Sequence, residues 1–222
     1  MGFLQLNRYM TRPLPPKQTL DDDAEDTQGV GQVHILEDKR TIIMEGTISE
    51  QITVPILRAM YDFSFTKGPV YFWIYSYGGD LDAAYAIYDT MQLLNKSGRK
   101  VITVGFGNIA SAATVLVLGG ETRLALESAN FMVHSVEYSF SGVTAAGKSF
   151  HNTVNKSQEK YYSLLSKGTH KTKEYWKNQI KDHKEYWFGT KEAKTYGLIH
   201  QILDHKAYSA ILGAYTNEEK KE

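Results

Sequence analysis

The chain has 222 residues, enough for one sizeable hydrophobic core, and a single domain of this size is ordinary for an α/β protein. Its 25 basic and 25 acidic residues cancel, which argues against a surface that holds nucleic acid or anionic lipid by bulk charge. The chain has no cysteine, so thiol chemistry, thiolate metal sites and disulfides are excluded. We expect neither metal nor cofactor. Proteins, peptides or small molecules are the expected partners.

The first residues, MGFLQLNRYMTRPLPP, lack both a long apolar core and a small-residue cleavage pattern. No stretch of about 18 uninterrupted apolar residues occurs in the sequence. We therefore expect a soluble protein that is neither secreted nor bound to a membrane. Residues 1–31 combine prolines with the acidic cluster DDDAED and show no sustained period of 2 or 3.6. This part is expected to be a flexible arm.

Strands and helices then alternate along the chain, which favours stacked βαβ units around a largely parallel sheet. The pattern predicts, in order, a hairpin that turns at residues 37–39, a helix over 50–62, a strand over 70–76, a helix over 80–95, a strand over 100–106, a helix over 107–120, and strands in TRLALE and NFMVH. A long helix with a narrow apolar stripe is expected from 144 to 166, and it is expected to project from the domain or to pack against another copy. A helix over 172–182, a short strand, a helical turn and a closing strand follow.

A pair of glycines, Gly78-Gly79, lies between the predicted strand 70–76 and the next helix. Glycines there let the backbone turn sharply and leave N–H groups free at a helix N-terminus, which can form an oxyanion hole or an anion site. A plain turn explains the pair equally well. The segment GNIASAATVLVLGG places Ser111 at the corresponding position after the next strand. Ser111 is therefore either a helix cap or a nucleophile.

His134 ends the apolar strand NFMVH. The carboxyl ends of parallel strands meet at one edge of a sheet, so Ser111, His134 and the glycine pair are expected to lie together there. His134 is then a candidate general base, although a histidine bonded to backbone at a strand end is the alternative. A carboxylate that orients the base is sought in IKDHKEYWF, at Asp182 or Glu185. Five other histidines lie in polar surroundings and are expected at the surface: His151, His170, His183, His200 and His205.

The segments MEGTI, IYSYGGDLDAAYAIYDTMQ, GFGNIASAATVLVLGG, FMVH and KEAKTYGLI resemble, in order and approximate spacing, the proteolytic subunit of the Clp protease, the ClpP family. The resemblance covers about residues 33–203. It implies a crotonase-like fold of stacked βαβ units with a protruding handle helix. It also implies an arm over 1–32, a protease domain over 33–205 with the handle at about 135–167, and a tail over 206–222. The implied assembly is a homo-oligomer of two stacked heptameric rings in the cytoplasm.

The resemblance implies a serine endopeptidase with Ser111 as nucleophile and His134 as base, and with the N–H groups of Gly79 and Ala112 as oxyanion donors. The sequence departs from the family in three ways. Tyr77 and Val136 stand where the family has proline, and the serine–histidine separation is about two residues shorter. The family's aspartate falls on Lys181, so Asp182 is expected as the acid after a one-residue shift, with Glu185 in reserve.

The family receives unfolded polypeptides from an AAA+ unfoldase that docks in apolar pockets of the ring face. Tyr71, Trp73 and Leu93 match positions that line those pockets, and core packing is the alternative for them. Two other readings of the chain stay open: an acyl-CoA-handling enzyme on the same fold, which needs no serine, and an idle ring subunit that assembles with an active paralogue. A peptidase with a serine–lysine dyad is a further relative, but its membrane anchor has no counterpart in this sequence.

Overall fold

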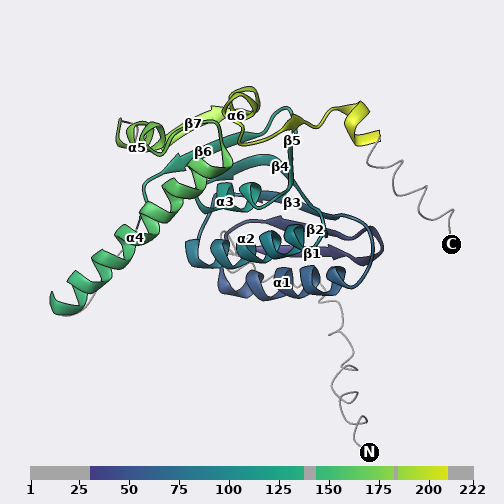
Figure 1. Cartoon of the computed structure of the whole chain (residues 1–222), viewed down its shortest axis with the longest axis horizontal. Coiled ribbons are helices and arrows are strands. Elements are labelled where there is room, and N and C mark those ends of the chain that lie inside the picture. The colour runs from purple at the N-terminus through teal and green to yellow at the C-terminus, as the bar shows by residue number, and fades with distance from the viewer. Residues whose placement is uncertain (1–30, 138–143, 183–184, 210–222) are drawn as a thin grey trace, which may run out of the picture.

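A computed structural model describes residues 31–137, 144–182 and 185–209 of the chain (Figure 1). Within these ranges the elements follow in the order β1 (Gln32–Leu36), the 3₁₀ turn η1 (Glu37–Lys39), β2 (Thr41–Glu45), α1 (Glu50–Ser64), β3 (Val70–Ser76), α2 (Leu81–Lys96), β4 (Val101–Ala110), α3 (Ala112–Leu118), β5 (Thr122–Ala125), β6 (Asn130–His134), α4 (Thr144–Gly168), α5 (Lys173–Asp182), β7 (Glu185–Gly189), α6 (Thr190–Tyr196) and β8 (Gln201–Ile202).

The sheet is mostly parallel, as the alternation of strands and helices predicts. Its strands run in the order β1-β2-β3-β4-β5-β8, while β6 pairs with β4 and β7 pairs with β6. Only the β1–β2 hairpin and the β6–β7 pair are antiparallel in the described chain. β4 is long enough to serve two neighbours, because residues 102–105 pair with β5 and residues 108–110 pair with β6. This fork places the end of β6 beside the end of β4.

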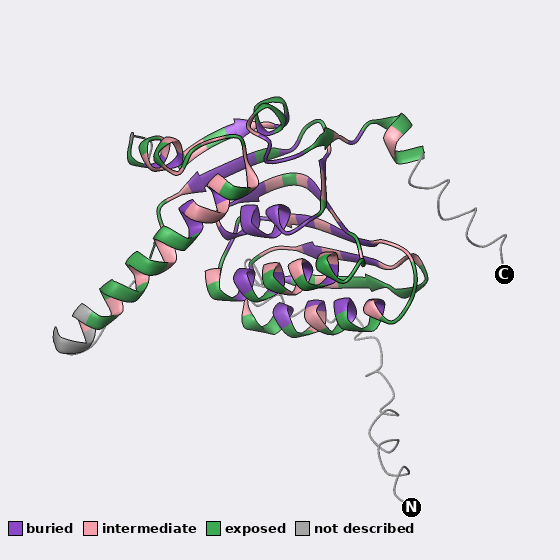
Figure 2. Cartoon of the chain, viewed as in Figure 1, coloured by how far each residue is buried: buried purple, intermediate pink, exposed green. Residues whose placement is uncertain are grey.

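Helices α1, α2 and α3 cover one face of the sheet, and the main hydrophobic core lies between them and the strands (Figure 1). The residues of α3 are all buried, which explains the run of small and branched apolar side chains after Ser111 (Figure 2). Alternate residues of β3 serve the two faces: Phe72 and Ile74 join the main core, whereas Trp73 packs against a smaller cluster with Val104 and Leu124 on the other face.

The long helix α4 extends away from the sheet at its N-terminal end and packs against the domain through its C-terminal half (Figures 1 and 2). Tyr161 and Leu165 are buried there. Glu159 on α4 forms ion pairs with two lysines of α5. Its carboxylate oxygens lie 2.6 Å from Nζ of Lys173 and 2.8 Å from Nζ of Lys177. The prediction of a long helix with one apolar stripe is therefore confirmed.

The largest difference from the predicted boundaries lies between β4 and α3. β4 continues to Ala110, four residues beyond the predicted end, and α3 is shorter than the expected helix over 107–120. The reason is pairing with β6, which keeps residues 108–110 extended and delays the turn to Ser111. Most of the predicted arm and of the C-terminal tail lies outside the described residues, so the proposed domain boundaries stay predictions.

Candidate active site

Ser111 occupies the sharp turn between β4 and α3. Its N–H donates to the carbonyl of Met132 on β6 at 2.8 Å, and its backbone adopts φ 55° and ψ −126°. A positive φ is costly for a serine, and such strain persists only where the surrounding structure holds it. The side chain makes no capping hydrogen bond to the helix. The capping role left open for Ser111 is therefore not what the structure shows.

The Ser111 hydroxyl instead contacts the imidazole of His134. Oγ of Ser111 lies 2.6 Å from Nε2 of His134, across 23 positions of sequence. Both residues sit at the carboxyl ends of neighbouring parallel strands, β4 and β6, so strand pairing brings them together. The His134 side chain is only 14% exposed. A nucleophile and a base at this distance meet the geometric requirement for proton transfer.

The glycine pair lies directly against the serine. Gly78 has φ 106°, and a Cβ on it would stand 2.7 Å from Cβ of Ser111, so only glycine fits this turn. The Ile48 N–H donates to the Gly78 carbonyl at 2.8 Å, and the Asp80 N–H donates to the Ile48 carbonyl at 2.9 Å. These bonds anchor the turn on both sides of Gly79.

Gly79 and Ala112 both line the cavity that contains Ser111. Within the described chain neither of their backbone N–H groups has a hydrogen-bond partner. Ala112 is the first residue of α3, where backbone N–H groups have no acceptor inside the helix. The two N–H groups are therefore available to an oxygen atom bound beside the serine.

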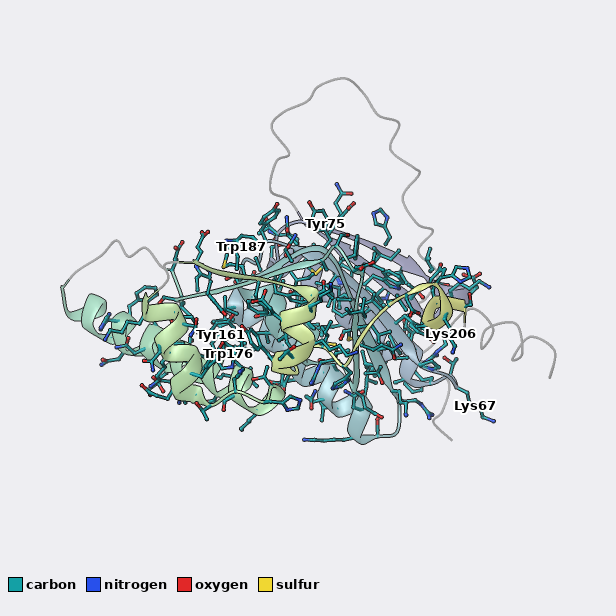
Figure 3. All side chains as sticks on the ribbon, turned by 90° about the horizontal axis from the view of Figure 1, so that it is seen from above. Lys67, Tyr75, Tyr161, Trp176, Trp187 and Lys206 are labelled. Atoms are coloured by element: carbon teal, nitrogen blue, oxygen red, sulfur yellow. The ribbon has the colours of Figure 1, made fainter. Side chains whose placement is uncertain are left out.

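A buried hydrogen-bond network supports the serine from behind. The Thr114 hydroxyl donates to the Ser111 carbonyl at 2.7 Å and lies 2.9 Å from the Tyr161 hydroxyl, which comes from α4. Burial raises the pKa of Tyr161 far above its ordinary value, so this group stays a neutral donor. Tyr161 lies on the side of the molecule that carries α4 (Figure 3). The long helix thus contributes directly to the surroundings of Ser111.

The cavity in front of the serine has a volume of about 810 Å³. Apolar and aromatic side chains form much of its wall, including Met132, Phe150, Val154, Tyr161 and Trp187. Among the described residues, the acidic and basic side chains on the wall are His134 and four carboxylates: Asp80, Asp82, Glu137 and Glu185. The volume of the cavity is large enough for a few residues of a peptide, and its wall carries several carboxylates.

The structure describes one of the two predicted acids and adds a third carboxylate near His134. The side chain of Asp182 lies outside the described part of the structure, so its placement stays a prediction. Glu185 stands opposite His134 in the β6–β7 register and lines the cavity, while its Oε2 accepts from the Trp187 indole at 3.1 Å. Glu137, which sequence reasoning missed, places Oε1 3.6 Å from Nδ1 of His134. Its position three residues after the histidine was the one available signal.

The remaining predicted residues do not join this site. Of the five histidines expected at the surface, four are exposed, and His183 lies outside the described residues. Tyr71 is buried, Trp73 packs on the sheet face opposite the helices, and Leu93 is 69% exposed on α2. A single chain therefore does not gather these three side chains into one pocket. In the described residues, no three side chains of the kinds that ligate metals form a metal-binding cluster, and no helix is long and apolar enough to cross a bilayer.

Fold and site together define a class of α/β protein with a serine–histidine pair at the carboxyl edge of a mostly parallel sheet. Residues 24–206 match the family model described as Clp protease, so the chain belongs to the Clp protease family. It is 31% identical over 175 residues to ATP-dependent Clp protease proteolytic subunit 2 of Borreliella burgdorferi, which covers 75% of this chain and 84% of that protein. The subunit of the same name from Treponema denticola is 30% identical over 173 residues, covering 75% and 83%.

A solved structure of a ClpP1 mutant from Listeria monocytogenes has the same fold. It superposes with a TM-score of 0.69 at 21% identity and covers 77% of this chain and 95% of that one. The predicted family and fold class, crotonase-like stacked βαβ units of the ClpP type, are therefore confirmed.

Proposed function

We propose that this chain hydrolyses peptide bonds with Ser111 as nucleophile and His134 as general base. The observation that carries the proposal is the 2.6 Å contact between Oγ of Ser111 and Nε2 of His134 on the wall of a peptide-sized cavity. Membership of the Clp protease family supports it, because the relatives are named as proteolytic subunits. The chain is thus a ClpP-like serine endopeptidase subunit.

In the acylation step, the Ser111 oxygen forms a bond to the scissile carbonyl carbon while its proton passes to Nε2 of His134. The C–N bond then breaks, and the imidazolium returns the proton to the departing amine. A water molecule attacks the resulting ester by the same route, with His134 again taking and returning a proton. The products are two shorter peptides and the free serine.

The negative charge that develops on the carbonyl oxygen needs donors in place before the reaction. The free N–H groups of Gly79 and Ala112 are proposed for this role. Each donor of this kind lowers the transition-state barrier by about 3 to 4 kcal/mol in serine proteases. Ala112 directly follows Ser111 in the strained turn, and both residues line the same cavity.

An acid that orients His134 completes the site. The resemblance assigns Asp182 to this role and keeps Glu185 in reserve, and both assignments stay predictions. A further candidate is Glu137, an exposed carboxylate on the cavity wall.

The chain is proposed to form closed rings of its own copies, two stacked heptamers as the resemblance implies, with α4 joining them. The apolar residues Tyr71, Trp73 and Leu93 are proposed to form docking pockets for an AAA+ unfoldase. Within one chain, Leu93 lies apart from Tyr71 and Trp73. Such a pocket therefore needs Leu93 of one copy and Tyr71 with Trp73 of the next. Unfolded polypeptides are the proposed substrates.

The proposed function is tested with a fluorophosphonate probe and a fluorogenic peptide on the assembled protein. We expect labelling at Ser111, and we expect Ser111→Ala to abolish both labelling and peptide cleavage. An assembled particle that the probe does not label would identify an idle ring subunit. Thioester chemistry that survives Ser111→Ala would identify an acyl-CoA-handling enzyme instead.

A further inference from the structure

We propose that Glu137 is the carboxylate that orients His134 in this chain. The inference rests on the proposed function, because an orienting acid matters only if His134 acts as a base. It assigns Glu137 as a positioning residue, since it acts through the imidazole and not on the substrate. Glu137, three positions after His134 on the same segment, would then orient the imidazole, the role that the resemblance assigns to Asp182 on α5.

The geometry places Glu137 on the correct side of the imidazole. Nε2 of His134 faces Ser111 at 2.6 Å, and the opposite nitrogen, Nδ1, faces Oε1 of Glu137 at 3.6 Å. In this order the Nδ1–H points to the carboxylate, and Nε2 is left free to accept the serine proton. The three groups therefore form a line of nucleophile, base and acid.

The distance of 3.6 Å is an ion-pair distance and not yet a hydrogen bond. The Glu137 side chain is 72% exposed, so a rotation can bring it closer without repacking the core. The attraction strengthens when His134 takes the serine proton and becomes an imidazolium. Catalytic contacts are often longer in the resting enzyme than in the transition state.

A departure of this sequence from the family pattern anchors the segment that carries Glu137. The Val136 N–H donates to Oε1 of Gln158 on α4 at 2.6 Å. A proline, which the family has at this position, lacks the N–H and could not make this bond. The substitution thus creates an attachment between α4 and the residue next to Glu137.

A second carboxylate near His134 bonds to a side chain of its own strand. Glu185 faces His134 across the β6–β7 pair, but its Oε2 accepts a hydrogen bond from the Trp187 indole at 3.1 Å. In the described structure, the carboxylate contact to Nδ1 of His134 comes from Glu137, at 3.6 Å. Among the carboxylates whose side chains the structure describes, Glu137 is therefore the acid that the observed contacts favour.

The test measures cleavage of a short fluorogenic peptide by the assembled protein and its Glu137→Gln, Glu137→Asp and Asp182→Asn variants. We expect Glu137→Gln to lower kcat by about tenfold or more with KM within about twofold, because the glutamine keeps the shape and loses the charge. Glu137→Asp is expected to retain more of kcat than Glu137→Gln. Glu127→Gln, on a residue outside the cavity wall, is the matched control.

A fall in kcat of less than tenfold in Glu137→Gln would overturn the proposal. An equal or larger fall in Asp182→Asn would also overturn it, in favour of the acid on α5. Turnover that survives Ser111→Ala refutes the proposed function itself, so the two failures are distinguishable.

The anchor is tested by Gln158→Met, which keeps the volume and removes the acceptor. We expect a lower kcat, and we expect the double variant with Glu137→Gln to lose no more than Glu137→Gln alone, because both changes act on one carboxylate. Additive losses would overturn the role of Gln158.

Discussion

The hydroxyl of Tyr161 lies 2.9 Å from Oγ1 of Thr114, and Thr114 in turn donates to the carbonyl of Ser111. Tyr161 belongs to α4, fifty positions further along the chain than Ser111. A helix that extends away from the domain therefore helps to hold the strained turn of the nucleophile.

The first prediction concerns this buried contact. Tyr161→Phe should lower the free energy of unfolding by about 1 kcal/mol, because one buried hydrogen bond is lost while the ring still fills its space. The kcat for a short peptide should fall as well, since the Ser111 carbonyl loses part of its support. Urea denaturation and steady-state kinetics measure the two effects.

Tyr61→Phe is the control for this change, because Tyr61 is exposed on α1 and its ring contact with Phe65 survives the substitution. It should leave both quantities unchanged. A Tyr161→Phe variant as stable as the control would show that the buried hydroxyl contributes nothing to the fold.

The second prediction compares two glycines with positive φ. Gly78→Ala should lower the free energy of unfolding by about 3 kcal/mol and abolish peptide cleavage, because its Cβ would stand 2.7 Å from Cβ of Ser111. Gly98→Ala has the backbone strain alone, since no atom lies within 4 Å of its Cβ position. It should cost about 1 kcal/mol and leave kcat unchanged.

Chemical denaturation and peptide cleavage of the two variants check this comparison. Equal losses of stability would mean that crowding at Ser111 adds nothing to the strain of a positive φ.

The third prediction follows from the negative charge of the cavity wall. Peptides with lysine or arginine near the scissile bond should be cleaved with a higher kcat/KM than otherwise identical peptides with glutamate. Each exposed charge pair contributes about 0.5 kcal/mol, so the preference should be a few-fold and should weaken with salt. Asp82→Asn and Glu185→Gln should each reduce it.

The measurement is kcat/KM for matched peptide pairs at low and high ionic strength. If the preference for basic over acidic peptides is the same at low and high ionic strength, its origin is not electrostatic.

The fourth prediction concerns the ion pairs between α4 and α5. Hydrogen bonds from Lys173 and Lys177 lower the pKa of Glu159 in the folded state. A carboxylate whose folded pKa lies below its unfolded value, about 4.3, stabilises the fold above that pH and loses the contribution as pH falls through the folded pKa. Glu159→Gln should therefore be less stable than the unaltered chain at pH 7, and the difference should disappear in strong acid.

Urea denaturation across this pH range measures the difference. Glu127→Gln, at an exposed position for which the described residues show no ion pair, is the control. A stability difference for Glu159→Gln that is the same at every pH would mean that packing, and not charge, links the two helices.

Much of this architecture is determined by the local sequence. Apolar runs bounded by glycine predict the order of strands and helices, and the single stripe from Phe150 to Leu165 predicts a long helix exposed on most sides. The positions of Gly78, Ser111 and His134 after buried strands also place them at one edge of a parallel sheet. Local periodicity and turn chemistry suffice for the elements, because each depends on residues close together in the chain, and the parallel order of the strands implies the common edge.

Only the tertiary structure decides how the site is assembled. Pairing of β4 with β6 moves the turn to Ser111 and brings His134 within 2.6 Å, although 23 positions separate the two residues. The support from Tyr161 and the anchor from Gln158 come from a helix whose docking angle no local pattern specifies. Which carboxylate faces His134 likewise depends on the backbone conformation after β6 and on the side-chain rotamer. For this reason the structure, and not the sequence, points to Glu137.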